Sequence, residues 1–229
     1  MKDATAGTLP PLRLFHYWRS SASWRVRWGL NIKGLTPEFV PVGLLDGEVD
    51  GPAHHARNPM AFVPVLEFLD YGSRTRVERP FRYMSESLPI LEWLDETCPG
   101  PKLLPTDPWL RYRTRHLAEI INAGTQPLQN LEAQALAADT PEKRKTWTIH
   151  WIDKGLNAYE ELVTETAGKF SLGDVPTLAD LCLIPQVYNA LRNDLNLGAW
   201  PTVKRIYETA LQLPQCLASA PEQHAPPVG

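Results

Sequence analysis

Apolar residues in the first part of the chain fall in short runs of the length expected for β-strands. Such runs occupy residues 12–18 and 39–42, a third begins at Val63-Pro64, and a fourth lies at residues 79–84. Proline inside a strand pattern indicates an edge position or a bent entry, so Pro64 should lie where the third strand begins. The pattern predicts a small sheet.

Helical periodicity alternates with these runs. Residues 22–34 place apolar and small residues on one helical face, and a glycine ends the pattern. After a turn at residues 85–87, a second helix carries Ile90 and Leu94. Strands and helices together predict an α/β domain over residues 1–96.

The second part of the chain has no strand pattern. Residues 97–107 are rich in proline and lack a hydrophobic period, which predicts a linker. Asp107 and Pro108 supply an N-cap and a first helical residue, and the helix that follows should run to about residue 138 with a bend at Pro127. Further helices are expected over residues 141–167, 177–193 and 201–212. Residues 108–229 are therefore predicted to form an all-α domain.

A capping box is expected at the start of one of these helices. In Thr177-Leu-Ala-Asp180 the threonine hydroxyl can bind the backbone N–H of Asp180, whose carboxylate can reach back to residue 177. This local pairing predicts that Asp180 stabilises the fold and has no role in catalysis.

Charge and composition exclude several classes of function. A formal net charge of -3 gives no overall attraction for nucleic acid or anionic lipid. Residues 1–11 lack the apolar core of a secretory signal, and the chain has no apolar run long enough to span a membrane, which predicts a cytoplasmic protein. The cysteines are odd in number and far apart, as expected for reduced structural thiols. The His54-His55 pair has no further ligand at suitable spacing, so no metal site is expected.

Residues 19–27, RSSASWRVR, place three serines at the expected start of the first helix. One serine suffices for an N-cap. A helix start also presents unpaired N–H groups and partial positive charge, so hydroxyls there can serve a bound anion. The segment alone leaves both interpretations open.

Several motifs occur in a characteristic order along the chain: RSSASWRVR, NPM, Val63-Pro64, ESLPILEWL, QPLQN and TLADLCLIPQV. In this order the chain resembles the zeta class of the glutathione transferase superfamily. The resemblance covers nearly the whole chain. It implies a thioredoxin-like α/β first domain, an all-α second domain, glutathione as cofactor and a homodimer.

By this resemblance, Ser20 is the hydroxyl that faces the glutathione sulfur, with Ser21 beside it at the helix start. Lowering the pKa of a thiol by about two units requires roughly 2.7 kcal/mol of differential stabilisation. A hydrogen bond to a charged group supplies about 1.5–3 kcal/mol, and a helix N-terminus about 0.3–2 kcal/mol. The two together suffice, so no protein nucleophile is required.

The resemblance also implies the other glutathione contacts. Val63 and a cis Pro64 expose backbone to the cysteinyl group, and Glu86 with Ser87 binds the γ-glutamyl end. Many zeta-class sequences have glutamine where this chain has Glu86, but a carboxylate can equally accept from the γ-glutamyl ammonium.

The implied activity is glutathione-dependent cis–trans isomerisation of maleylacetoacetate, or of a close analogue such as maleylpyruvate, in aromatic amino-acid catabolism. Such a small anionic unsaturated substrate needs cations, and Arg19 and Arg192 match arginines that contact anionic ligands in the family. Gln126 and Asn130 match positions where family members turn polar groups into the cleft. A solvent-exposed role stays open for Arg192, Gln126 and Asn130.

Two departures from the family pattern bear on function. Ala22 stands where many zeta-class sequences have cysteine, which argues against disulfide-exchange chemistry. Residues 70–84 form a longer, arginine-rich connection than usual. Two alternatives remain open: a broader transferase or dehalogenase that consumes glutathione, and a non-catalytic binding module. The complete set of glutathione-site residues argues against the second.

Overall fold

The computed structural model describes residues 11–69 and 82–226, which divide into two compact units. The first unit takes in the described residues up to Pro101 together with residues 218–226, and the second is Lys102–Leu217. The arginine-rich connection predicted to be unusual lies mostly outside the described residues. The assignment of all of residues 108–229 to the helical domain does not hold for 218–226, because Ser219 is hydrogen-bonded into the first unit.

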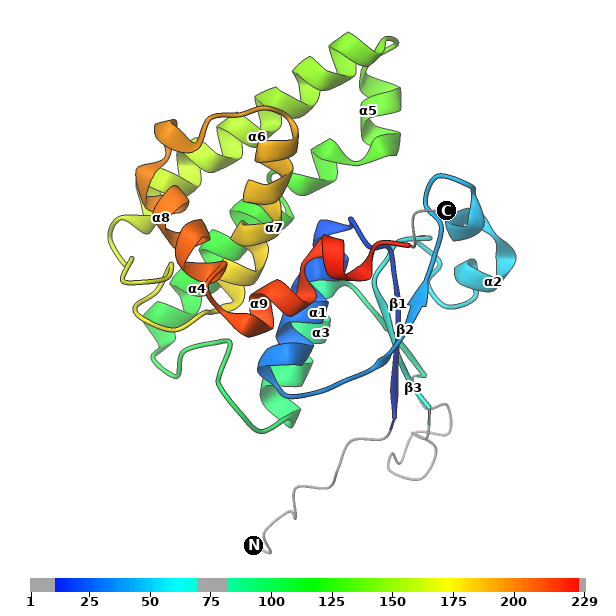
Figure 1. Ribbon diagram of the computed structural model, residues 1–229, viewed down its shortest axis with the longest axis horizontal. Helices are drawn as coiled ribbons and strands as arrows, with labels where there is room; N and C mark the ends of the chain where they lie inside the picture. Colours follow the sequence, from blue (N-terminus) through cyan, green and yellow to red (C-terminus); the bar gives the residue numbers. More distant parts are fainter. Residues whose placement is uncertain (1–10, 70–81, 227–229) are drawn as a thin grey trace, which may run out of the picture. The chain divides into compact units, whose positions relative to one another are not determined.

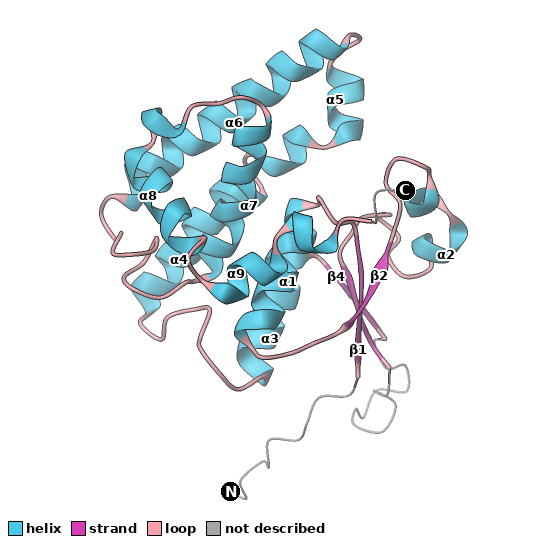
Figure 2. Cartoon of the chain, viewed as in Figure 1, coloured by secondary structure: helices cyan, strands magenta, loops and turns pink. Residues whose placement is uncertain are grey.

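A four-stranded sheet in the order β2-β1-β3-β4 forms the centre of the first unit. Its strands are β1 (Leu12–His16), β2 (Glu38–Pro41), β3 (Val65–Phe68) and β4 (Tyr83–Ser85) (Figure 2). β1 and β2 run parallel, whereas β3 runs antiparallel to both β1 and β4. A strand is therefore present at each of the four predicted places. β1 ends two residues earlier than expected, β2 begins one residue earlier, and β3 begins two residues later.

Helices cover both faces of this sheet (Figure 1). α1 (Ser21–Ile32) and α3 (Ser87–Thr97) pack together on one face. The short α2 (Pro52–His55) and a 3-10 turn at Glu48–Asp50 lie on the other, where Val49 joins an apolar cluster with Phe15 of β1. These short elements escaped prediction because three or four residues cannot display a helical period.

α1 begins where the three serines predict. Its C-terminus lies at Ile32, and Gly34 just beyond adopts the left-handed conformation with φ of 68° that favours glycine. Trp24 and Trp28, one turn apart on this helix, are both almost fully buried. They serve packing, as expected for large aromatic side chains at this spacing.

The second unit is helical. Its main helices are α4 (Pro108–Asn122), α5 (Leu131–Ala137), α6 (Pro141–Val163), α7 (Leu178–Arg192) and α8 (Pro201–Ala210), and α9 (Pro214–Ser219) leads into the first unit. α7 packs against α4 and α8, and its apolar sequence is buried over most of its length. None of the helices in the described part of the chain combines the length and apolar character needed to cross a lipid bilayer. Cys98, Cys182 and Cys216 are buried, which is consistent with a structural role.

The prediction of one bent helix from residue 108 to about residue 138 is wrong. The chain forms α4, then a 3-10 turn at Gln126–Gln129, then α5. Pro127 cannot donate a backbone N–H, and Thr125 leaves the helical region with φ of -126°. Its hydroxyl donates to the carbonyl of Ile120 at 2.7 Å and so satisfies an orphan group at the end of α4.

The capping box predicted for α7 is present. Both the N–H and the hydroxyl of Thr177 donate to Oδ2 of Asp180, at 2.8 and 2.9 Å. The other carboxylate oxygen accepts the N–H of Ser171 at 2.8 Å, and Asp180 is completely buried. The residue therefore ties the loop before α7 to the helix start.

Candidate active site

Three chain segments meet at one edge of the sheet because of the strand directions. Phe15 of β1 pairs with Val65 of β3, and Val65 pairs with Ser85 of β4. The end of β1, the start of β3 and the end of β4 therefore lie side by side. The residues that the resemblance assigns to glutathione follow or precede these strand ends: Ser20, Ser21, Val63, Pro64, Glu86 and Ser87.

Ser20 is the N-cap of α1. Its backbone is extended, with φ of -64° and ψ of 122°, and its Oγ accepts the N–H of Ser23 at 3.1 Å. This bond occupies a lone pair of the hydroxyl oxygen and leaves the O–H proton available for donation. Capping and anion stabilisation are therefore compatible in one side chain. Ser21 is the first helical residue and is half-buried.

Val63 and Pro64 form the bend that leads into β3. The peptide bond between them is cis, as the resemblance implies, and both residues are buried. No hydrogen bond joins the backbone N–H or C=O of Val63 to another residue within 11–69 or 82–226. These backbone groups can therefore pair with the backbone of a bound peptide.

Glu86 and Ser87 form the turn between β4 and α3. Glu86 is exposed and has a positive φ of 67° as the residue that precedes the helix. Ser87 is buried, and its Oγ accepts a hydrogen bond of 3.2 Å from Nη1 of Arg25 on α1. Sequence reasoning did not assign this role to Arg25, because the contact depends on the packing of α1 against α3.

Arg27 is a second buried arginine on α1 that sequence reasoning left without a role. Its Nε donates to the carbonyl of Ser219 at 2.8 Å and its Nη2 to the carbonyl of Trp18 at 3.0 Å. Burial lowers the pKa of Arg27 to about 9, so the guanidinium remains protonated at neutral pH. The sequence held one hint of such a role: Arg25 and Arg27 are charged residues in the middle of a helix whose neighbouring residues are mostly apolar or small.

His16, at the end of β1, lies against this arginine. Its Nδ1 is 3.2 Å from Nη1 of Arg27. Burial, then the charge of Arg27, then His224, lower the pKa of His16 to about 3. The imidazole is therefore neutral at physiological pH, and its Nδ1 accepts a hydrogen bond from Nη1 of Arg27.

The shifted pKa of His16 predicts a pH-dependent stability. The unfolded state binds more protons than the folded state between the ordinary histidine pKa and about 3, so stability should fall as the solution is acidified through this range. Between about pH 7 and about pH 5 the histidine should account for roughly 2 kcal/mol of lost stability. Urea denaturation at both values, compared with His16→Gln, isolates the contribution. An equal pH dependence in the variant would show that His16 is not responsible.

Arg19 lies in the loop before Ser20. Its Nη2 donates to the hydroxyl of Tyr17 at 3.3 Å, and its guanidinium carbon lies 4.6 Å from the ring centroid of Trp18. These contacts hold a half-buried cation next to the proposed thiol site.

The remaining predicted substrate residues belong to the second unit. Gln126 begins the 3-10 turn and is half-buried. Asn130 is exposed and caps α5 by accepting the N–H of Leu131 at 3.0 Å. Arg192 is the exposed last residue of α7, where a cation favours the helix dipole. Local roles therefore exist for Asn130 and Arg192 besides any role in binding.

Two motifs used to identify the resemblance meet in the second unit. Gln129 of QPLQN and Gln186 of the α7 segment are buried and exchange two amide hydrogen bonds of 3.2 Å each. This reciprocal pair fixes the 3-10 turn that carries Gln126 against α7. Neither glutamine was predicted as important, because the pairing joins residues far apart in the sequence.

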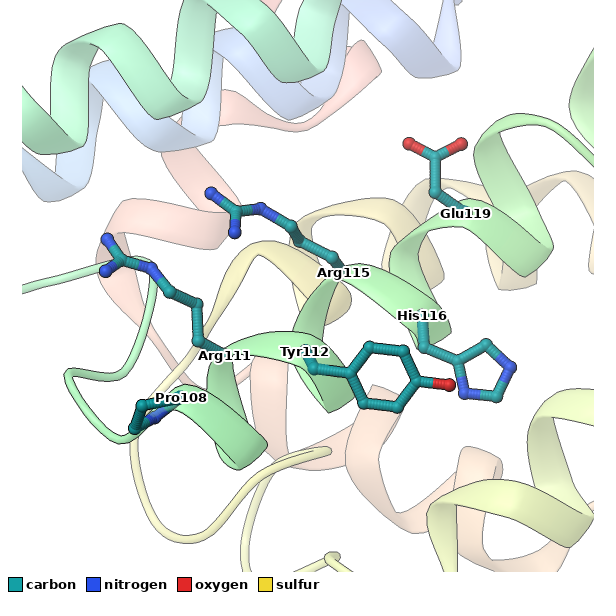
Figure 3. Close-up of a pocket in the computed structure, with 6 residues that line it drawn as sticks. All are labelled: Pro108, Arg111, Tyr112, Arg115, His116 and Glu119. Carbon is teal, nitrogen blue, oxygen red and sulfur yellow. The ribbon is translucent and has the colours of Figure 1, made fainter.

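The second unit also has an open hollow of about 540 Å³ along α4. It is lined by Pro108, Arg111, Tyr112, Arg115, His116 and Glu119 (Figure 3). Tyr112 and His116 stack with ring centroids 5.6 Å apart. The lining does not include Gln126, Asn130 or Arg192, so the hollow is separate from the predicted substrate residues.

Comparison with known proteins agrees with the fold. The family described as Glutathione S-transferase, N-terminal domain, matches residues 14–102. This match places the first unit in the glutathione transferase class, and the cis Val63-Pro64 bond agrees with it.

Relatives that match most of the chain identify the class within the glutathione transferase superfamily. A probable maleylacetoacetate isomerase from Vibrio cholerae is 41% identical, and the match covers 92% of this chain and 96% of the relative. The crystal structure of maleylacetoacetate isomerase from Anaeromyxobacter dehalogenans with bound glutathione is 46% identical with a TM-score of 0.83, covering 96% of this chain and 98% of that one. A bacterial zeta-class maleylpyruvate isomerase is 33% identical with a TM-score of 0.83, covering 95% and 100%. The chain belongs to the maleylacetoacetate isomerase family, the zeta class of glutathione transferases.

Proposed function

We propose that the protein is a glutathione-dependent cis–trans isomerase that acts on maleylacetoacetate or a close analogue such as maleylpyruvate. The observation that carries this proposal is the convergence of Ser20, the cis Pro64 and the Glu86-Ser87 turn at one edge of the sheet. The related Anaeromyxobacter enzyme binds glutathione in its active site.

The residues at the sheet edge fit the chemical groups of glutathione. The Ser20 hydroxyl and the N-terminus of α1 suit a thiolate, because both favour negative charge. The open backbone groups of Val63 suit the cysteinyl peptide. The exposed Glu86 carboxylate suits an ammonium group, and the Ser87 hydroxyl, held by Arg25, suits the neighbouring carboxylate.

When bound, glutathione supplies a thiolate that can add to an activated double bond and leave again once the bond has rotated. The protein's part is to keep that sulfur ionised and to hold the substrate. We assign the first task to Ser20, assisted by Ser21. We assign the second to Arg19 and Arg192 as anchors for carboxylates.

Gln126 and Asn130 complete the proposed substrate set as hydrogen-bonding groups. The half-buried Gln126 lies on the turn fixed by the Gln129–Gln186 pair, which supports a preorganised role. Asn130 supplies only those lone pairs and amide protons that its cap of α5 leaves unused.

The stoichiometry of glutathione tests this function. We expect saturable binding of reduced glutathione by calorimetry, and isomerisation of maleylacetoacetate or maleylpyruvate with no net loss of glutathione, because addition is followed by elimination. Consumption of one glutathione per product would instead establish a substituting transferase or dehalogenase. Absence of binding into the millimolar range would leave only a non-catalytic role.

The substrate anchors make a separate prediction. Arg19→Ala and Arg192→Ala should each lower kcat/KM for maleylacetoacetate by on the order of tenfold, as expected for a charged hydrogen bond. Turnover of the neutral chlorodinitrobenzene should change little. Lys204→Ala, which removes an exposed cation of α8 that is 3.9 Å from Glu208, serves as control. Equal losses with both substrates would contradict the anchor role.

We also propose that the protein is a cytoplasmic homodimer. The resemblance to the zeta class supports both statements. Sedimentation equilibrium with the purified protein tests the assembly, and a mass equal to one chain at micromolar concentration would contradict it.

A further inference from the structure

The C-terminal segment, residues 218–226, is tied to α1 in the first unit. Nε1 of Trp24 donates to Oγ of Ser219 at 2.9 Å, and Nε of Arg27 donates to the Ser219 carbonyl at 2.8 Å. The ring of His224 lies 4.7 Å from that of Phe39, centroid to centroid. The segment therefore lies against Trp24 and Arg27 of α1.

The same guanidinium also holds the loop between β1 and α1, which ends at Ser20. Nη2 of Arg27 donates to the Trp18 carbonyl at 3.0 Å, and Nη1 lies 3.5 Å from the Tyr17 carbonyl. That carbonyl also accepts the backbone N–H of Ser20 at 3.1 Å. A chain of contacts thus leads from Arg27 through Tyr17 to the proposed thiol-site serine.

Resting on the proposed function, we propose that Arg27 is a positioning residue for the Ser20 hydroxyl and that the C-terminal segment holds Arg27 in place. Arg27 is completely buried, and it donates to the backbone carbonyls of Ser219 and Trp18 and to Nδ1 of His16. It therefore binds both the loop and Ser219. The β1–α1 loop has short turns but no regular secondary structure, so its position depends on these contacts.

The geometry of arginine is essential to this role. The planar guanidinium directs several N–H groups at once, and here they reach Ser219 in the C-terminal segment and both His16 and Trp18 around the end of β1. The ammonium group of lysine is a single point at the end of a flexible stem. Arg27→Lys therefore keeps the charge while losing the fork that joins the segments.

The test compares Arg27→Lys with the parent by the pKa of bound glutathione, followed by ultraviolet thiolate absorbance. We expect the pKa of the bound thiol to rise by about one unit and kcat to fall about tenfold, because a displaced Ser20 donates a weaker hydrogen bond to the sulfur. The dissociation constant for glutathione should change less, since Val63, Glu86 and Ser87 remain in place.

The matched control is Arg113→Lys in the second unit. Arg113 is also buried, and its Nη2 donates to the Leu162 carbonyl at 2.7 Å and to Glu165 at 2.9 Å. Its replacement should lower the melting temperature without moving the pKa of bound glutathione. A shift of that pKa in both variants would show general destabilisation, and the positioning role would be overturned.

The outcomes separate this inference from the function on which it rests. A parent protein that fails to bind glutathione refutes the function. A parent that binds it, with an unchanged thiol pKa and kcat in Arg27→Lys, refutes the positioning role alone. If Arg27→Lys does not fold, Ser219→Ala loosens the C-terminal segment more gently, and it should shift the thiol pKa in the same direction. An unchanged pKa in that variant also overturns the proposal.

Discussion

Replacement of Asp180 by alanine is expected to lower the free energy of unfolding by about 3–5 kcal/mol with little change in glutathione affinity. The carboxylate accepts three hydrogen bonds, from the N–H and hydroxyl of Thr177 and from the N–H of Ser171. Its removal leaves three buried donors unpaired. A simple lost cap costs only about 1 kcal/mol, so the size of the effect reports the additional bond to Ser171.

Denaturant unfolding and calorimetry with glutathione measure the two quantities. Asp174→Ala is a suitable control, because Asp174 is an exposed residue that accepts one backbone N–H, from Lys169 at 3.1 Å. It should cost about 1 kcal/mol or less. If Asp180→Ala kept its stability and lost glutathione affinity, Asp180 would be a site residue and the assignment to folding would fail.

The features that sequence reasoning predicted correctly depend on neighbours in the chain. The serines at the start of α1 and the Thr177–Asp180 box work over three residues, so residue type and spacing suffice to find them. The buried tryptophans follow from helical spacing. The cis Pro64 came from the resemblance, which no local pattern could replace. The glutathione contacts implied by the same resemblance stay predictions.

The features that escaped prediction join distant parts of the chain. Arg25 and Ser87 are 62 positions apart, and Arg27 and Ser219 are 192 apart. Only the packed structure brings Arg25 against Ser87, and Arg27 against the β1–α1 loop and Ser219. The return of residues 218–226 to the first unit escaped for the same reason. The break near Pro127 is local, and there the sequence indicated a bend where the chain in fact leaves the helix.

The largest effect on catalysis is expected from Ser20. Its hydroxyl caps α1 through Ser23, and the same oxygen carries the proton proposed to stabilise the thiolate. Ser20→Ala should raise the pKa of bound glutathione by about one to two units and lower kcat about a hundredfold, as follows from the loss of a hydrogen bond to a charged group. Ser21→Ala should have a much smaller effect, because Ser21 lies within the helix.

Glycine separates the two roles of Ser20. Alanine at an N-cap costs about 1 kcal/mol of stability, whereas glycine costs only a few tenths. Ser20→Gly should therefore retain most of the parental stability while it shows the same rise in thiol pKa and the same fall in kcat as Ser20→Ala. Ser20→Thr, which keeps the hydroxyl, should recover much of the activity. The opposite result would be a thiol pKa that follows stability across these variants, with Ser20→Gly close to the parent. Capping alone would then explain the effect of replacing Ser20. The thiolate would have to be stabilised by the helix N-terminus or by another donor.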